Sequence, residues 1–298
     1  MKESFTIVVD TSCDLNPDYI KEHGIEFMPI PFTLDDKEHK QGYWQKISGA
    51  EFYDALKNGS VAKTAQTNPD AFVTAFTEYA KQGRDVLYLI LSSGLSTTFQ
   101  NSQIALKDVK KSYPDCNIFP IDSISATSYN SMLAVIAVRK RAEGLSAEQT
   151  AAYLEEVKHR VLGHFTVDDL MFLHRGGRLS KLSAIGGSLL GVKPILNIQP
   201  DGTLKLKGKA RGREAALKLM VSQLECCINP DTTLDTIVIC HADCEKDAEK
   251  LREMVKSTVK VNHIEIVMMG PVIGAHLGPG AVAFSYEAAV TREEYEKG

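Results

Sequence analysis

Hydroxyl-bearing residues gather at four places in the sequence, three of them directly after an apolar run. Residues 10–14, 92–96 and 122–126 follow such runs, and residues 63–69 precede a helix that Asn68 can cap. Hydroxyl groups and the N–H groups of a helix N-terminus bind anions without the help of a lysine. Each place alone is better explained by helix capping, but the four together predict a shared oxyanion ligand.

A histidine stands in a segment rich in glycine and proline near the end of the chain. Residues 270–280 contain four glycines and two prolines around His276. This composition predicts a tightly bent loop with some glycines at positive φ. A histidine beside exposed loop N–H groups suits a carboxylate or a phosphate, although an incidental histidine in a structural turn is an equally good explanation.

Two kinds of catalysis are compatible with the same residues. Asp10 and Asp122 could hold Mg²⁺ in a phosphotransferase or kinase-like enzyme, but an aspartate after a strand is just as often a turn or capping residue. Ser96 and His276 could serve a serine hydrolase, but the sequence has no GxSxG motif. The Walker A, GxGxxG and HExxH motifs are also absent.

The six cysteines show neither a CxxC pair nor the spacing of a secreted disulfide framework. Cys240 and Cys244, with the intervening His241, could ligate a metal only if distant residues completed the set. Small apolar core residues are the better explanation of both cysteines. We therefore expect no metal site.

Composition and charge exclude several classes of protein. The chain has 298 residues and a net charge of −4, which argues against a domain held on nucleic acid or anionic lipid by lysine and arginine. No apolar run approaches the roughly 20 residues that span a bilayer. The first residues lack the apolar core of a signal peptide. We expect a cytoplasmic protein without stable membrane insertion.

The first half of the sequence alternates strand and helix patterns. Apolar strand patterns cover about residues 5–9, 86–91 and 117–121, and helix patterns follow each of them. Such alternation is typical of a parallel sheet with helices on both faces. We therefore predict an N-terminal α/β domain over residues 1–162.

The second half combines a hairpin with further helices and strands. Residues 193–199 and 203–209 are predicted to pair around a turn at 200–202. Helix and strand patterns then alternate between about residues 213 and 267. The combination predicts an α+β domain over residues 163–298 with a mixed sheet, and so a two-domain α/β protein.

A series of short motifs resembles the DegV family of bacterial fatty-acid-binding proteins. The motifs occur in family order over about residues 5–285, and the ordered set is more specific than any motif alone. They are Asp10-Thr11-Ser12, Thr64-Ala65-Gln66, Ser92-Ser93-Gly94-Leu95-Ser96, Asp122-Ser123-Ile124-Ser125-Ala126, Leu173-His174-Arg175-Gly176-Gly177-Arg178, Lys193-Pro194-Ile195-Leu196, Arg211-Gly212 and Gly274-Ala275-His276-Leu277-Gly278-Pro279-Gly280.

The resemblance implies a DegV-like fold with one long-chain fatty acid buried between the two domains. It also implies a carrier that is not itself an enzyme and that presents the fatty acid carboxylate to an ATP-dependent fatty acid kinase, which makes an acyl phosphate. The fatty acid is then the only ligand, without a cofactor. Transient contact with a membrane would allow lipid exchange.

The resemblance also implies where the carboxylate binds. Thr64 and Ser96 are expected to hold it through their hydroxyls, with N–H groups near Gly94 and Leu95. His276 is expected to reach the carboxylate from the second domain and to assist phosphoryl transfer by its charge. A neighbouring carboxylate should raise the pKa of His276 above its ordinary value of about 6.5.

Two further sets of residues complete the prediction. The apolar stretch around Ile185 and Leu189 is expected to line the acyl chain, although an ordinary helix packing stripe explains it as well. Arg175, Arg178 and Arg211 are expected to flank the site and to face the kinase or its phosphate rather than the lipid.

Overall fold

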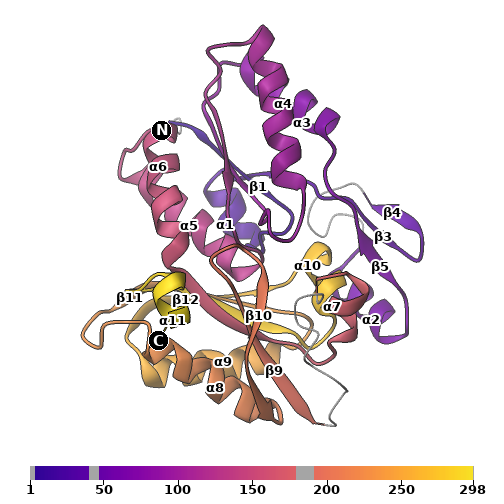
Figure 1. The fold of residues 1–298 in the computed structure, drawn as a ribbon, viewed down its shortest axis with the longest axis vertical. Helices are drawn as coiled ribbons and strands as arrows, with labels where there is room; N and C mark the ends of the chain where they lie inside the picture. Colours follow the sequence, from indigo (N-terminus) through magenta and orange to yellow (C-terminus); the bar gives the residue numbers. More distant parts are fainter. Residues whose placement is uncertain (1–3, 40–46, 179–190, 298) are drawn as a thin grey trace.

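The computed structural model of this chain describes residues 4–39, 47–178 and 191–297 (Figure 1). Its first half contains a four-stranded sheet in the order β2-β1-β6-β7, and all neighbouring strands are parallel. This sheet confirms the parallel arrangement predicted from the sequence. The strands are β1 (Thr6–Asp10), β2 (Glu26–Met28), β6 (Val86–Ile90) and β7 (Ile118–Asp122).

Helices with recognisable start signals cover this sheet. The Oδ1 atom of Asn68 accepts a hydrogen bond from Ala71 N at 2.8 Å, which caps α3 as predicted. Ser146 and Gln149 form a capping box at the start of α6. Apart from one helix described with the third sheet below, the helices of this half are α1 (Pro17–Glu22), α3 (Pro69–Lys81), α4 (Thr98–Ser112), α5 (Ser128–Ala142) and α6 (Ala147–Val157).

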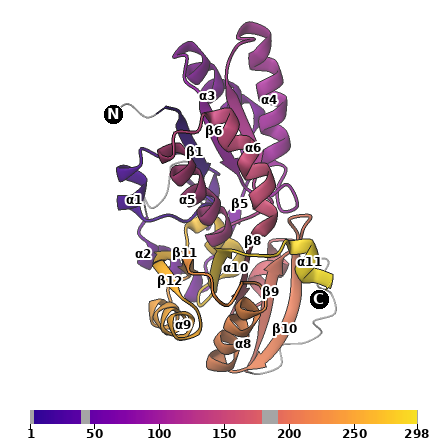
Figure 2. The ribbon, with the colours of Figure 1, turned by 90° about the vertical axis from the view of Figure 1, so that its left-hand side faces the viewer.

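The second half contains a six-stranded mixed sheet in the order β10-β9-β8-β13-β11-β12. Only β11 and β12 pair in parallel among these strands. The predicted mixed sheet and hairpin are thereby confirmed, and α8 (Arg213–Glu225) and α9 (Glu245–Thr258) pack together on one face (Figures 1 and 2). The strands are β8 (Val161–Thr166), β9 (Val192–Ile198), β10 (Leu204–Arg211), β11 (Leu234–His241), β12 (Val261–Met268) and β13 (Val282–Glu287).

A third, antiparallel sheet was not predicted. It consists of β3 (Phe32–Leu34), β4 (Lys37–His39) and β5 (Ala62–Thr64), in the order β4-β3-β5. Strands of three residues leave too short a hydrophobic pattern to recognise in a sequence. The neighbouring helix α2 (Gly49–Lys57) joins this region to the second half, because Tyr53 Oη donates to Met269 O at 2.7 Å.

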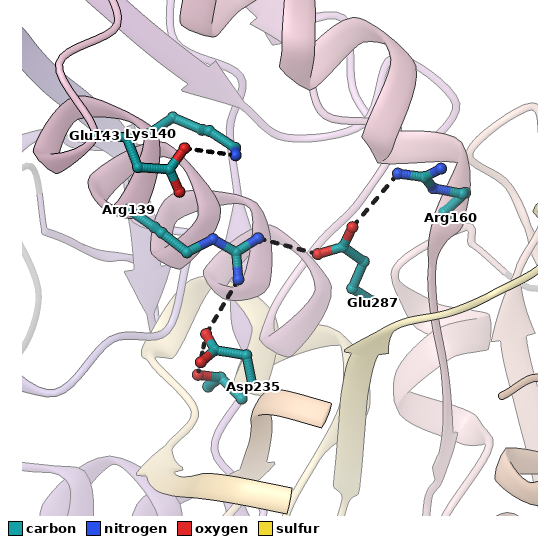
Figure 3. A network of polar contacts seen from close by, with 7 residues as sticks. Arg139, Lys140, Glu143, Arg160, Asp235 and Glu287 are labelled. Atoms are coloured by element: carbon teal, nitrogen blue, oxygen red, sulfur yellow. Dashed lines mark hydrogen bonds and ion pairs between the residues drawn. The ribbon is translucent and has the colours of Figure 1, made fainter. Parts of the chain in front are cut away.

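Helix α5 joins the two halves of the molecule. It is almost completely buried, and it packs against strands of both large sheets. Figure 3 shows how Arg139 of this helix contacts Asp235 of β11 and Glu287 of β13, each at 3.1 Å, while Arg160 contacts Glu287 at 3.4 Å. Because α5 packs against both sheets, the predicted boundary between two domains at residue 162 stays a prediction. The first strand of the second sheet, β8, begins close to that residue.

The segment around His276 forms a helix rather than the predicted bent loop. Helix α10 (Pro271–Leu277) has Gly270 at its N-cap position and Pro271 in its first turn, where proline's missing N–H costs nothing. Among residues 270–280, positive φ values occur only after the helix, at Gly278 and Gly280. The remaining short elements are η1 (Lys158–Arg160), α7 (Met171–Arg175) and α11 (Arg292–Lys297).

None of the helices in the described ranges is both long and apolar enough to cross a membrane.

Candidate functional site

A cavity of about 640 Å³ lies between elements of both halves of the chain. Its size is within the range of roughly 300–1,000 Å³ that is typical of small-molecule sites. Two pairs of polar residues on the wall contact each other, Thr64 with His276 and Gln66 with Thr97. Other polar residues of the wall are Ser93, Ser96, Thr127 and Arg178. The rest of the wall is largely apolar and includes Ile30, Leu91, Phe165, Leu173, Ile198 and Val272.

Thr64 and His276, which the sequence assigned to one site, are in direct contact. Thr64 Oγ1 lies 2.7 Å from His276 Nε2, at the end of β5 and on α10 respectively. Asp14 fixes the start of α10, because its carboxylate accepts hydrogen bonds from Gly270 N and Thr127 Oγ1, both at 2.7 Å. The aspartate therefore holds the helix that carries the imidazole.

Burial controls the charge of His276. Desolvation, followed by the nearby guanidinium of Arg178, lowers the pKa of His276 to about 4. The imidazole is therefore neutral near pH 7, and a carboxylate beside it would act against both effects. Its Nδ1 atom is buried and has no hydrogen-bond partner among the described residues.

Ser96 lies on the same cavity wall, two residues before helix α4 begins at Thr98. Its Oγ atom lies 2.8 Å from Thr98 Oγ1 and accepts a hydrogen bond from Thr98 N at 3.2 Å. The N–H groups of Gly94 and Leu95 both donate to Ser92, to Oγ at 3.1 Å and to the carbonyl oxygen at 3.0 Å. The N–H groups predicted to bind an anion thus already donate to Ser92 in this structure.

The three arginines assigned together from the sequence occupy different places. Arg178 lines the cavity, and its guanidinium donates from Nε and Nη2 to Leu95 O at 3.2 and 2.9 Å. Arg175 is exposed and stacks on Phe172, 4.6 Å from the ring centroid. Arg211 is exposed at the end of β10 and is not part of the cavity wall. Arg178 therefore belongs with the cavity residues, unlike the other two.

Some cavity residues could not be singled out from the sequence, and two predicted ones cannot be placed. Ile185 and Leu189 lie outside the described residues. Gln66 and Thr97 contact each other at the cavity rim, and only their closeness to Thr64 and Ser96 pointed to them. The apolar wall residues of β8 and β9 carry no sequence signal that separates them from ordinary core residues.

The arrangement of Asp10 and Asp122 argues against a magnesium site. Asp10 is completely buried and accepts hydrogen bonds from Leu91 N at 2.6 Å and from the N–H and hydroxyl of Ser12. Burial raises the pKa of Asp10 to about 6. Asp122 accepts from Ser93 N and Ile124 N. Within the described ranges, no group of three or more potential metal-ligating side chains occurs, and Cys240 and Cys244 are free thiols.

The contacts of Ser96 and His276 also argue against a serine hydrolase. In such an enzyme the histidine takes the proton of the serine and is oriented by an acid at its second nitrogen. Here the imidazole meets Thr64 instead of Ser96, and its Nδ1 atom faces the backbone of Gly176. A histidine with a pKa of about 4 is also a weak base at neutral pH.

Comparison with known proteins identifies the family. A family model described as "Uncharacterised protein, DegV family" matches residues 4–289. A DegV domain-containing protein of Clostridium perfringens is 36% identical over 282 residues, which are 94% of this chain and 96% of that protein.

Solved structures share the same fold. A fatty-acid-binding DegV family protein from Thermus thermophilus is 27% identical, with a TM-score of 0.85 over 95% of this chain and 99% of that one. The Fatty Acid Kinase (Fak) B3 protein of Streptococcus pneumoniae, solved with linoleic acid, is 21% identical, with a TM-score of 0.81 over 95% and 99% of the two chains.

Proposed function

This chain belongs to the DegV family, and we propose that it binds one long-chain fatty acid in the cavity of about 640 Å³. The observation that carries the proposal is the division of the cavity wall into a polar part around Thr64 and His276 and a largely apolar remainder. A fatty acid likewise has a polar carboxylate at one end and an apolar acyl chain. The fatty acid binding of the Thermus thermophilus relative supports the assignment.

The carboxylate of the fatty acid binds at the polar part of the wall. The hydroxyls of Thr64 and Ser96 donate to it, His276 approaches it from α10, and Gly94 and Leu95 form the adjoining wall. Arg178 adds a positive charge there, and a charged partner makes such hydrogen bonds stronger than those between neutral groups. The carboxylate in turn raises the pKa of His276 from about 4.

The acyl chain fills the apolar part of the cavity. Each buried methylene group contributes about 0.8 kcal/mol, so a long chain binds tightly with few polar contacts. The walls come from both halves of the molecule, with Leu91 and Ile273 as examples. Ile185 and Leu189 remain predicted wall residues.

We further propose that the chain is a cytoplasmic carrier that presents the carboxylate to a separate ATP-dependent fatty acid kinase. The name of the Streptococcus pneumoniae relative and the missing Walker A motif support this role. The exposed guanidinium groups of Arg175 and Arg211 are available to a partner. His276 assists by stabilising the carboxylate as it attacks the phosphate, because a carboxylate needs no general base.

Mass spectrometry of a solvent extract tests the first part of the proposal. The purified chain should release a long-chain fatty acid in about one-to-one ratio, and the delipidated chain should rebind it. A protein that neither releases nor rebinds a fatty acid would contradict the proposal. ATP turnover by the isolated chain would favour the phosphotransferase, and ester cleavage would favour the hydrolase.

A further inference from the structure

The residues that line the cavity range from exposed to almost completely buried. Gln66 and Thr97 at the rim are exposed to solvent. Tyr129 of α5 also lines the cavity, but its side chain is only 1% exposed. Ile198 of β9, which also lines the cavity, is 3% exposed.

A buried arginine stands behind Tyr129. The guanidinium carbon of Arg292 lies 5.6 Å from the centroid of the Tyr129 ring, and Arg292 is 2% exposed. Its guanidinium donates to Ile124 O at 2.7 Å, Val161 O at 3.0 Å and Ser125 Oγ at 2.8 Å. No salt bridge joins it to a carboxylate within the described ranges.

These contacts make the part of the cavity wall formed by Tyr129 rigid. A buried cation that lost its acceptors would carry a large desolvation penalty, so Arg292 cannot readily move away from the main-chain carbonyls that it binds. The acceptors belong to separate segments, at residues 124–125 and at Val161. The ring of Tyr129 therefore rests on a fixed support and cannot yield to a ligand that presses against it.

We infer that Tyr129, supported by Arg292, closes the inner end of the acyl cavity and sets the longest fatty acid that the protein accepts. This inference rests on the proposed function and adds the residue that determines chain length. Each added methylene raises affinity about fourfold while it finds apolar surface. The methylene that first meets the ring of Tyr129 ends that increase, because overpacking a rigid wall is unfavourable.

Affinity measurements with a series of saturated fatty acids test the inference on the delipidated full-length chain. In the unchanged protein, affinity should rise with chain length and then fall. Tyr129→Leu, which shortens the side chain, should move that maximum to longer acids and improve binding of the first excluded acid by about tenfold. Tyr129→Phe keeps the ring and should leave the maximum unchanged.

Tyr88→Leu is the matched control. Tyr88 is also 1% exposed, but it packs with Phe72 and Phe76 in a separate core cluster and does not line the cavity. Both leucine variants remove a buried tyrosine and should lower thermal stability. Only Tyr129→Leu should change the preferred chain length.

The possible outcomes separate the inference from the proposed function. If the unchanged protein binds none of the acids, the proposed function fails, and the inference fails with it. If it binds them but Tyr129→Leu keeps the same maximum, the inference alone is overturned. Should Tyr129→Leu not fold, Tyr129→Trp provides the same test in reverse, because its larger ring must favour shorter acids. An unmoved maximum in that variant also overturns the inference.

Discussion

The Cα atom of Gly176 lies against the imidazole of His276, so that a Cβ atom at position 176 would stand 2.2 Å from Nδ1. Gly176 follows α7, whereas His276 is on α10, and the two segments pack together. The backbone of Gly176 has ordinary helical angles, so glycine is needed there for the closeness of the ring rather than for its conformational freedom.

Gly176→Ala should displace His276. The new methyl group can be accommodated only if the imidazole turns away and gives up its 2.7 Å contact with Thr64. We expect a loss of about 1–3 kcal/mol in the free energy of unfolding and weaker fatty acid binding, measured by denaturant titration and calorimetry. Gly177→Ala is the control, because nothing lies within 4 Å of its Cβ position.

Gly177→Ala is expected to lower stability for a different reason, namely backbone strain. Gly177 has a φ of +72°, so alanine there strains the backbone by about 1–2 kcal/mol without touching the histidine. Gly177→Ala should therefore lower stability and keep fatty acid affinity. If both variants bind equally well, the contact between Gly176 and His276 does not matter for binding.

The pKa of His276 should make stability depend on pH. Because its pKa is lowered to about 4 in the folded protein, the unfolded chain binds more protons between that value and about 6.5. The free energy of unfolding should therefore fall as the pH drops from 6.5 to 4, by up to about 3 kcal/mol from this residue. Buried His164, with a pKa of about 3, adds a loss of the same sign.

His276→Gln should remove part of this pH dependence. Thermal unfolding of the delipidated protein, followed at several pH values from 7 to 4, measures the effect. A His276→Gln protein with the full acid destabilisation would show that His276 does not titrate in this range.

The regular elements of this fold were predictable from local patterns, whereas the grouping of Thr64 with His276 was expected only from the family resemblance. Strands β1 and β6 and helices α3 and α8 carry long hydrophobic patterns or capping residues that specify them locally. Thr64, in contrast, ends a strand of three residues. Its contact with His276 joins positions 212 residues apart, and nothing in a local pattern specifies such a contact.

Two details of the site depend on packing that the sequence does not show. The four glycines of residues 270–280 suggested a bent loop, yet Gly274 is inside helix α10, where glycine is needed because a Cβ would stand 2.6 Å from Tyr53 Oη. Arg175 and Arg178 were assigned together through the family resemblance, and of these two only Arg178 contacts Leu95 and lines the cavity. Packing between distant segments decides both cases.

Removal of the Thr64 hydroxyl should weaken fatty acid binding. Thr64→Val keeps the shape of the side chain but deletes one donor to the carboxylate, and a hydrogen bond to a charged group contributes about 1.5–3 kcal/mol. We expect affinity to fall about tenfold to a hundredfold by calorimetry. Thr74→Val on the outer part of α3 is the control, since the Thr74 hydroxyl bonds only to Asp70 O. Equal affinities of the two variants would place the carboxylate elsewhere.

Arg178 and Arg211 should differ in what their loss affects. Arg178 lines the cavity, so Arg178→Ala should lower both fatty acid affinity and acyl phosphate formation by the proposed partner kinase. Arg211 is exposed and lies outside the cavity wall, so Arg211→Ala should keep the affinity while acyl phosphate formation falls. Calorimetry and a coupled kinase assay on both variants measure the two quantities.

Lys218→Ala, at an exposed position of α8, controls for the loss of one surface charge and should change neither the affinity nor acyl phosphate formation. The assignment of Arg211 to the partner surface fails if Arg211→Ala loses both properties together, or if it supports phosphorylation at the unchanged rate.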